Sequence, residues 1–116
     1  MAITHYSYDK ITIDGEKFDM DLIISPSGDV SSWAFDRVTH RITPVDFQDL
    51  VTEEVKTIII GTGYNGDGYL DAEAKALTKE LQGKGVAVHI LPTSKAVNLF
   101  NATPKQGLLT LLHIRY

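Results

Sequence analysis

The second half of the chain alternates short aliphatic runs with an amphipathic segment, and this rhythm constrains the fold more than any other feature. Residues 57–60 form a β-branched run typical of a strand buried on both faces, and residues 86–91 form a second such run. Between them, apolar residues recur at helical spacing from Leu70 to Leu81. The pattern predicts an α/β domain in which helices pack on a central sheet and the two runs are neighbouring parallel strands.

A further helix and strand complete this alternation. Pro92-Thr93-Ser94 opens a segment with helical spacing, and residues 108–114 are typical of a final strand. The first third of the chain is different, because turn signals at Asp14-Gly15 and Pro26-Ser27-Gly28 separate short alternating segments. These segments predict an N-terminal β-meander beside or over the central sheet. The predicted strands are residues 10–13, 18–25 and 30–35, followed by a short helix over residues 44–54.

One domain accounts for the whole chain, residues 1–116. Hydrophobic residues make up 43% of the sequence and charged residues 22%, which is typical of a soluble globular protein. A chain of 116 residues leaves little room for a second domain. We therefore expect a single domain with one sizeable core.

Several classes of protein are excluded by what the sequence lacks. It contains no cysteine, so disulfides, thiolate metal sites, iron–sulfur clusters and a cysteine nucleophile are ruled out. Residues 1–10 are polar and carry no apolar core of a signal peptide. The longest apolar runs are far shorter than the roughly 20 residues that cross a bilayer. We expect a soluble, cytoplasmic protein with no membrane partner.

Charge is spread unevenly along the chain, with a net charge of −7 over residues 1–54 and +3 over residues 55–116. No run of like charge is long, and no basic stripe interleaved with aromatic residues is present. We interpret these charges as belonging to solvated faces. Nucleic acid is therefore not an expected partner.

A glycine-rich loop follows the first aliphatic run. Gly61-Thr62-Gly63-Tyr64-Asn65-Gly66 matches the G-x-G-x-x-G pattern of dinucleotide-binding folds. The predicted helix begins only near Leu70, and the next strand ends without an acidic residue to hold a ribose. These departures from the pattern disfavour a dinucleotide site. Two interpretations stay open: a tight strand-to-helix turn, or a cradle for an anion or another small ligand.

The best candidate for a ligand site is a crevice at the carboxyl ends of the two parallel strands. The segments that follow these strands contain Gly61 to Gly63 and Pro92 to Ser94. For Thr93 and Ser94, helix N-capping is the structural alternative, and for Trp33 it is core packing. The candidate ligand-binding residues are Gly61, Thr62, Gly63, Thr93 and Ser94, and the candidate accessory residues are Trp33, Arg37 and His40.

No residues assemble a recognisable catalytic or metal-binding motif. His5, His40, His89 and His113 lack the short spacings of metal ligands. His89 and His113 lie in predicted strands, where packed or edge positions are expected. Nothing near His40 resembles a nucleophile or an orienting carboxylate. We expect no metal and no cofactor, and the sequence leans against an enzyme.

The order and spacing of several short segments resemble a known family. The segments are Ile58 to Gly63, Gly85 to Val88, Leu91 to Val97, Phe100-Asn101, Gly107, and earlier Trp33, Arg37, His40, Pro44 and Asp46. The chain resembles the small single-domain proteins of unknown function of archaea and bacteria. That family includes the adipogenesis-associated Mth-type domain protein and a mitochondrial complex I assembly factor.

The resemblance implies a three-layer α/β domain with a mixed central sheet, whose last strand runs antiparallel to its neighbours. It implies no established enzymatic activity, and the eukaryotic relatives act through protein partners.

Two functions follow as hypotheses. The first is a non-enzymatic interaction or assembly-factor-like module with an unidentified protein partner, which exposed Trp or Phe side chains would support. The alternative is a small-molecule or anion-binding protein, or an unrecognised enzyme, that uses the Gly61–Gly63 and Pro92–Ser94 crevice. A homodimer is a third option, because dimers are the commonest assembly of small domains.

Overall fold

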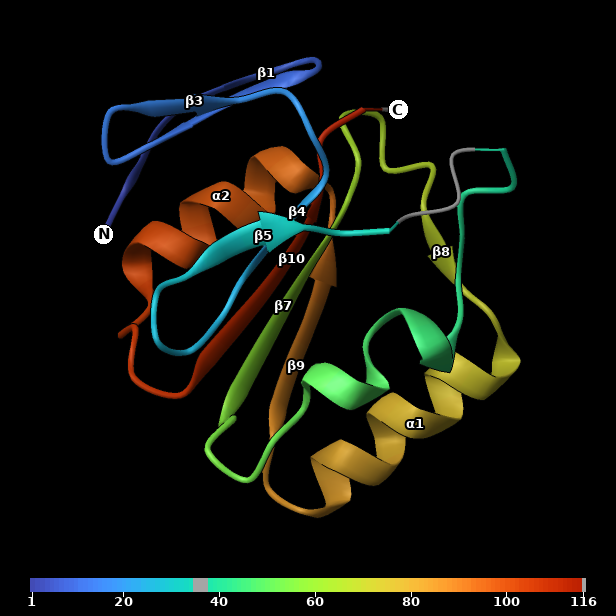
Figure 1. The fold of residues 1–116 in the computed structure, drawn as a ribbon. Coiled ribbons are helices and arrows are strands. Elements are labelled where there is room, and N and C mark those ends of the chain that lie inside the picture. Colours follow the sequence, from blue (N-terminus) through green and yellow to red (C-terminus); the bar gives the residue numbers. More distant parts are fainter. Residues whose placement is uncertain (35–37, 116) are drawn as a thin grey trace.

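The computed structural model describes residues 1–34 and 38–115, and Figure 1 shows their arrangement. The strands are β1 (Ile3–Ser7), β2 (Lys10–Ile13), β3 (Glu16–Phe18), β4 (Leu22–Ile24), β5 (Val30–Ser32), β6 (Arg41–Ile42), β7 (Thr57–Thr62), β8 (Tyr69–Leu70), β9 (Ala87–Leu91) and β10 (Leu108–His113). The helices are α1 (Ala72–Gly83) and α2 (Thr93–Ala102), with two short 3₁₀ helices, η1 (Pro44–Asp46) and η2 (Gln48–Leu50).

The central sheet has five strands in the order β5-β4-β10-β7-β9. The predicted parallel pairing of the two aliphatic runs is confirmed, because β7 pairs with β9 in parallel. The burial predicted for the second run is wrong, because β9 lies at the edge of the sheet and its side chains are exposed or half-buried. The last strand was expected to run antiparallel to both of its neighbours, and this expectation is wrong for one of them. β10 is antiparallel to β4 but parallel to β7. The physical reason is that α2 carries the chain back to the starting end of the sheet, so the strand after it runs the same way as the strand before it.

The first three strands form a separate antiparallel sheet, β1-β2-β3, which confirms the predicted N-terminal meander. Its strands differ from those predicted, because β1 was not expected and the strand predicted from residue 30, β5, lies in the central sheet. The single strand predicted over residues 18–25 is two strands, β3 and β4, which belong to different sheets. Residues 19–21 carry the chain from one sheet to the other. Alternation of apolar side chains continues through this crossing, and the sequence pattern therefore shows no break.

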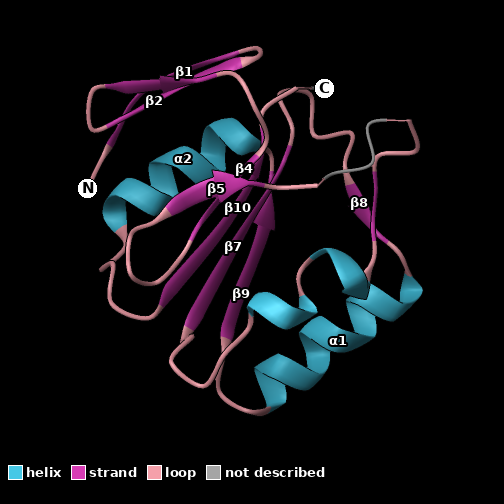
Figure 2. Ribbon diagram, viewed as in Figure 1, coloured by secondary structure: helices cyan, strands magenta, loops and turns pink. Residues whose placement is uncertain are grey.

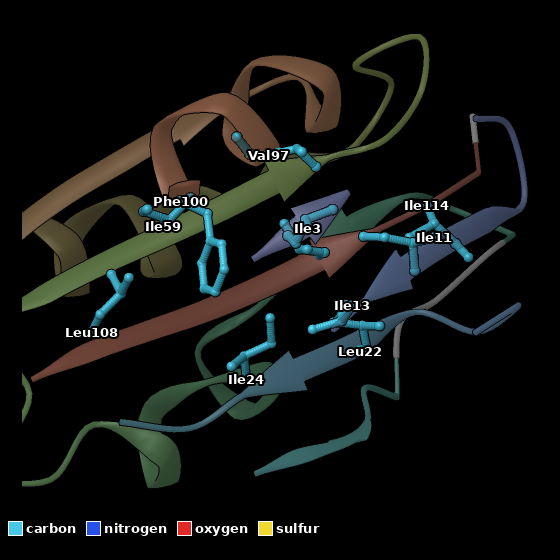
Figure 3. Close-up of a cluster of buried hydrophobic side chains, with 12 residues drawn as sticks. Ile3, Ile11, Ile13, Leu22, Ile24, Ile59, Val97, Phe100, Leu108 and Ile114 are labelled. Carbon is cyan, nitrogen blue, oxygen red and sulfur yellow. The ribbon is translucent and has the colours of Figure 1, made fainter. Parts of the chain in front are cut away.

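The helices cover both faces of the central sheet, as predicted (Figure 2). α2 and the meander lie on one face, while α1, η1 and η2 lie on the other. Side chains of β7 alternate accordingly: Ile59 packs in the core on the α2 side, and Ile58 and Ile60 pack on the α1 side. Figure 3 shows the α2-side core, a single cluster that includes Phe100 and Val97 of α2, Ile59 of β7 and the meander residues Ile11 and Ile13.

Local chemistry sets the start of α1. The Asp71 carboxylate accepts a hydrogen bond from the Ala74 amide at 2.8 Å, a standard N-cap. Leu70, expected as the first residue of this helix, instead ends β8, which pairs with β6. The short helix predicted over residues 44–54 is present only in part, as the 3₁₀ helices η1 and η2, which end at Leu50. In the described part of the chain, neither α1 nor α2 has the length and apolar character needed to cross a bilayer.

Candidate functional site

The two segments of the expected crevice meet at the carboxyl end of β7. The Gly63 amide donates a hydrogen bond to the Thr93 hydroxyl oxygen at 2.9 Å, and the Thr93 amide donates to the Gly63 carbonyl at 3.0 Å. The Thr93 hydroxyl in turn donates to the carbonyl of His113 at the end of β10. One threonine thereby joins α2 to the ends of two neighbouring strands.

Side chains fill the space between these segments. Thr93 is fully buried, and a Cβ placed on Gly61 would lie 2.8 Å from the Thr93 hydroxyl oxygen and 2.9 Å from Leu112 Cδ2. Thr62 and Gly63 are also buried, whereas Ser94 is exposed and lines an open pocket of about 300 Å³ between β1 and α2. The predicted neighbours are therefore in contact, and ligand binding by them stays a prediction.

Helix capping, the structural alternative for Thr93 and Ser94, is wrong for both hydroxyl groups. The N-cap of α2 is Pro92, which has no side-chain donor or acceptor to satisfy the helix amides. The Thr93 hydroxyl bonds to Gly63 and His113 instead. Its position after a strand made capping the natural expectation, but the neighbouring strand end competes for the same hydroxyl.

The three candidate accessory residues have different outcomes. Trp33 is 4% exposed and packs in the α1-side core, where its indole N–H donates to the Asp46 carbonyl at 3.0 Å. The core-packing alternative therefore describes Trp33. His40 is half-buried, and its ring centroid lies 6.1 Å from that of His113. Arg37 lies outside the described residues.

A buried Asp–His pair lies beside this site and was not predicted. Asp21 Oδ1 lies 2.9 Å from His113 Nδ1 and accepts a hydrogen bond from the Ile114 amide at 2.9 Å. Both side chains are buried, with 2% and 0% of their surface exposed. An Asp–His pair can serve general acid–base chemistry where a substrate reaches it. In this structure the Asp21–His113 pair links the segment before β4 to the end of β10.

Three tyrosines lie close to the buried Asp21–His113 pair and form a partly exposed aromatic surface. The Tyr6 hydroxyl donates to the Ile114 carbonyl at 3.1 Å. Burial raises the pKa of Tyr6, helped by the nearby Tyr64 and Asp21, while a hydrogen bond with Thr93 opposes the rise. The Tyr64 ring lies 6.1 Å from the Tyr6 ring and 5.7 Å from the Tyr8 ring, the latter edge-on. We call Tyr6, Tyr8 and Tyr64 the tyrosine surface.

Exposed Trp or Phe side chains were expected as a sign of an interaction module, and the exposed rings of this surface are tyrosines instead. Trp33, Phe47 and Phe100 are all buried, whereas Tyr64 is 50% exposed and Tyr8 is 43% exposed.

In the described part of the chain, no three His, Asp or Glu side chains are arranged to hold a metal ion. His113 is packed, and His89 lies on the exposed edge strand β9, as their strand positions predicted.

Comparison with known proteins identifies the family of this chain and other proteins with the same fold. A family model described as "Protein of unknown function (DUF498/DUF598)" matches residues 3–110. The conserved hypothetical protein PH1505 from Pyrococcus horikoshii has a similar structure, with a TM-score of 0.85, 25% identity and full coverage of both chains.

More distant structures share the same fold. The solved structure called MT938 has a TM-score of 0.78 at 16% identity, covering 99% of this chain and 98% of its own. A Mth938-like domain from Bordetella pertussis, a structural genomics target, has a TM-score of 0.69 at 20% identity, covering 96% of this chain and 84% of its own. A search of curated proteins finds no match. The resemblance stated from the sequence is confirmed.

Proposed function

Since this chain belongs to the DUF498/DUF598 family, whose function is unknown, we propose from its own surface that it is a non-enzymatic protein-interaction module. The observation that carries this proposal is the tyrosine surface. Tyrosine is enriched at the energetic centres of protein interfaces, because its large ring buries apolar area while its hydroxyl keeps a hydrogen bond. Tyr8 and Tyr64 present about half of their surface to solvent.

The tyrosine surface is held in place before any partner binds. Tyr6 is fixed by its hydrogen bond to the Ile114 carbonyl, and Tyr64 packs against both other rings. The loop that carries Tyr64 closes on itself, because the Gly66 amide donates to the Gly63 carbonyl at 3.2 Å and the Gly68 amide to the Thr62 carbonyl at 2.8 Å. Side chains that are already ordered lose less entropy on binding, which favours affinity.

The polar groups of the candidate site support an interaction module over catalysis. The Asp21 carboxylate, the His113 ring and the Thr93 hydroxyl are buried and make hydrogen bonds to the protein. An acid or base must come within hydrogen-bond reach of a substrate to work. The alternative function, ligand binding where Gly61–Gly63 meets Pro92–Ser94, stays a prediction, and the direct contact of these segments gives it less support.

The proposal is tested by capture of a partner with matched variants. Tagged wild-type protein, a Tyr8→Ser/Tyr64→Ser double variant and a Val45→Ser control are incubated with native lysate at low salt and read by quantitative mass spectrometry. Val45 is a suitable control because it is 77% exposed and lies on η1, on the opposite face of the central sheet.

We expect a stoichiometric protein partner with the wild type and the Val45→Ser control, and at least about tenfold less of it with the double variant. Equal capture by all three proteins, or no stoichiometric partner for the wild type, contradicts the proposal.

A further inference from the structure

We propose that two copies of this chain pair antiparallel through strand β9, about a two-fold axis at His89, and so join their central sheets into one. This inference goes beyond the proposed function, because it uses the edge of the central sheet and not the tyrosine surface. It rests on the backbone geometry of β9, on the uncharged sequence of that strand, and on the single register that both allow.

β9 is the last strand in the order β5-β4-β10-β7-β9, so within residues 1–34 and 38–115 only one of its edges is paired. The Ala87 amide donates to the Lys56 carbonyl, beside β7, at 3.0 Å. In a parallel ladder, alternate residues direct both backbone groups to the same neighbour. Ala87, His89 and Leu91 therefore bond toward β7, while Val88 and Ile90 direct their N–H and C=O groups outward.

The outer edge of β9 lacks the devices that normally protect an edge strand. Such edges are usually short, charged, bulged or interrupted by proline. β9 has five residues, Ala-Val-His-Ile-Leu, and its pairing with β7 is regular along its length. The opposite edge, β5, has only three residues, and two of its side chains are serines. The unprotected edge of the sheet is therefore the β9 edge.

The outward backbone groups fit one antiparallel register. Pairing Val88 with the partner's Ile90, and Ile90 with the partner's Val88, uses every outward N–H and C=O of both strands. A shift toward Val86 meets an amide already bonded to the Leu81 carbonyl at 3.0 Å. A shift the other way meets Pro92, which has no N–H to donate.

Side chains in this register are compatible on both faces. Val88 and Ile90 lie opposite Ile58 and Ile60 of β7 and therefore share the α1 face of the sheet. Pairing brings them together across the axis and covers Ile90, which is 44% exposed in the single chain. On the α2 face, His89 meets the partner's His89, and Ala87 meets the partner's Leu91. Within the strand, no Lys, Arg, Asp or Glu opposes another.

A cysteine placed at the axis tests the register directly, because the natural chain contains no cysteine. His89 and the partner's His89 form a non-hydrogen-bonded pair, whose Cα atoms in such ladders lie about 4.5 Å apart, within disulfide range. We expect His89→Cys to form a disulfide-linked dimer of twice 12.8 kDa under mild oxidation. Gln48→Cys, exposed on η2, serves as the control for random collision. A His89→Cys dimer that forms no faster than the Gln48→Cys dimer overturns the register.

The assembly itself is tested on the natural chain by sedimentation over a concentration series. We expect a dimer for the wild type and a monomer for Ile90→Lys, since a lysine at an edge blocks strand pairing. Circular dichroism must show the same fold for both proteins, as expected for a substitution at an exposed side chain. A wild-type chain that stays monomeric throughout the series, or a dimer that survives Ile90→Lys, overturns the proposal.

Discussion

Asp21 is the residue on which three segments of this fold depend. Its carboxylate meets the His113 ring and accepts from the Ile114 amide, and its carbonyl accepts from the Trp33 amide at 2.9 Å. The carboxylate is buried, so its removal leaves buried donors without an acceptor.

We therefore predict that Asp21→Ala lowers the free energy of unfolding by about 3 kcal/mol, the order seen when one partner of a buried pair is removed. Urea unfolding followed by circular dichroism measures the change. Asp19→Ala, two residues away and exposed, provides the control and is expected to be near neutral. Similar losses for both variants would show that the Asp21 pair does not hold these segments.

Gly61 is a second position where a single atom matters. We predict that Gly61→Ala lowers the free energy of unfolding by about 1–3 kcal/mol, because the added Cβ would press on the Thr93 hydroxyl oxygen and on Leu112. Gly83→Ala is the matched control, since nothing lies within 4 Å of its Cβ and it ends α1. Thermal unfolding compares the two, and an unchanged Gly61→Ala protein would contradict the close contact between the segments.

Tyr6 gives the fold a dependence on alkaline pH. Burial raises its pKa in the folded state above the unfolded value of about 10. The folded state therefore keeps its proton where the unfolded state loses it, and stability falls as the pH rises above about 10. We predict a smaller loss of stability between pH 8 and pH 11 for Tyr6→Phe than for wild type, measured by urea unfolding. Equal losses would contradict the assignment to Tyr6.

At the scale of elements, the start of α2 is tied to the sheet by one hydroxyl. We predict that Thr93→Val costs about 1–2 kcal/mol of unfolding free energy, because the Gly63 amide loses its acceptor in a buried site. Thr93→Ser keeps the hydroxyl and is expected to retain more of this stability, and Ser94→Ala is expected to be near neutral. The same order of stabilities in a denaturant series would confirm the link, and an unaffected Thr93→Val protein would refute it.

Elements with a strong local period could be predicted from the sequence, and those set by tertiary pairing could not. The β-branched run at β7 and the helical spacing of α1 are local signals. β1 carries polar residues and an irregular pairing with β2 between Ile3 and His5, so its period is broken. The division of residues 18–25 between two sheets depends on partners far away in the chain.

The candidate site shows the same division between local and distant signals. That Gly61–Gly63 and Thr93 would meet followed from the rule for parallel strands, and the contact is present. The Asp21–His113 pair joins residues 92 positions apart, and neither lies in a motif. The sequence offered only two local signs of this pair. One is an aspartate directly before the aliphatic strand Leu22–Ile24, and the other is a histidine at the end of the strand Leu108–His113.

At the scale of the whole molecule, the two surfaces that we propose for assembly are separate. The tyrosine surface lies where the end of β1 and the Tyr64 loop meet, and the free edge lies along β9. PH1505 matches this fold over the full length of both chains, so the elements that carry the two surfaces lie within the shared fold.

Because the two surfaces use different residues, we predict that they act independently. Ile90→Lys is expected to abolish the dimer while capture of the partner persists, and Tyr64→Ser is expected to weaken capture while the dimer persists. Sedimentation and partner capture on the same two variants measure both properties. Loss of both properties in either variant would show that the two surfaces are coupled.

The central claim is that the tyrosine surface binds a protein, and the affinity of the captured partner for purified chains tests it most directly. Isothermal titration compares wild type, Tyr64→Ser and the control Val45→Ser. Loss of a hot-spot tyrosine costs about 2 kcal/mol, so we predict a Kd roughly 30-fold weaker for Tyr64→Ser and unchanged for Val45→Ser. The same Kd for all three chains would contradict the account.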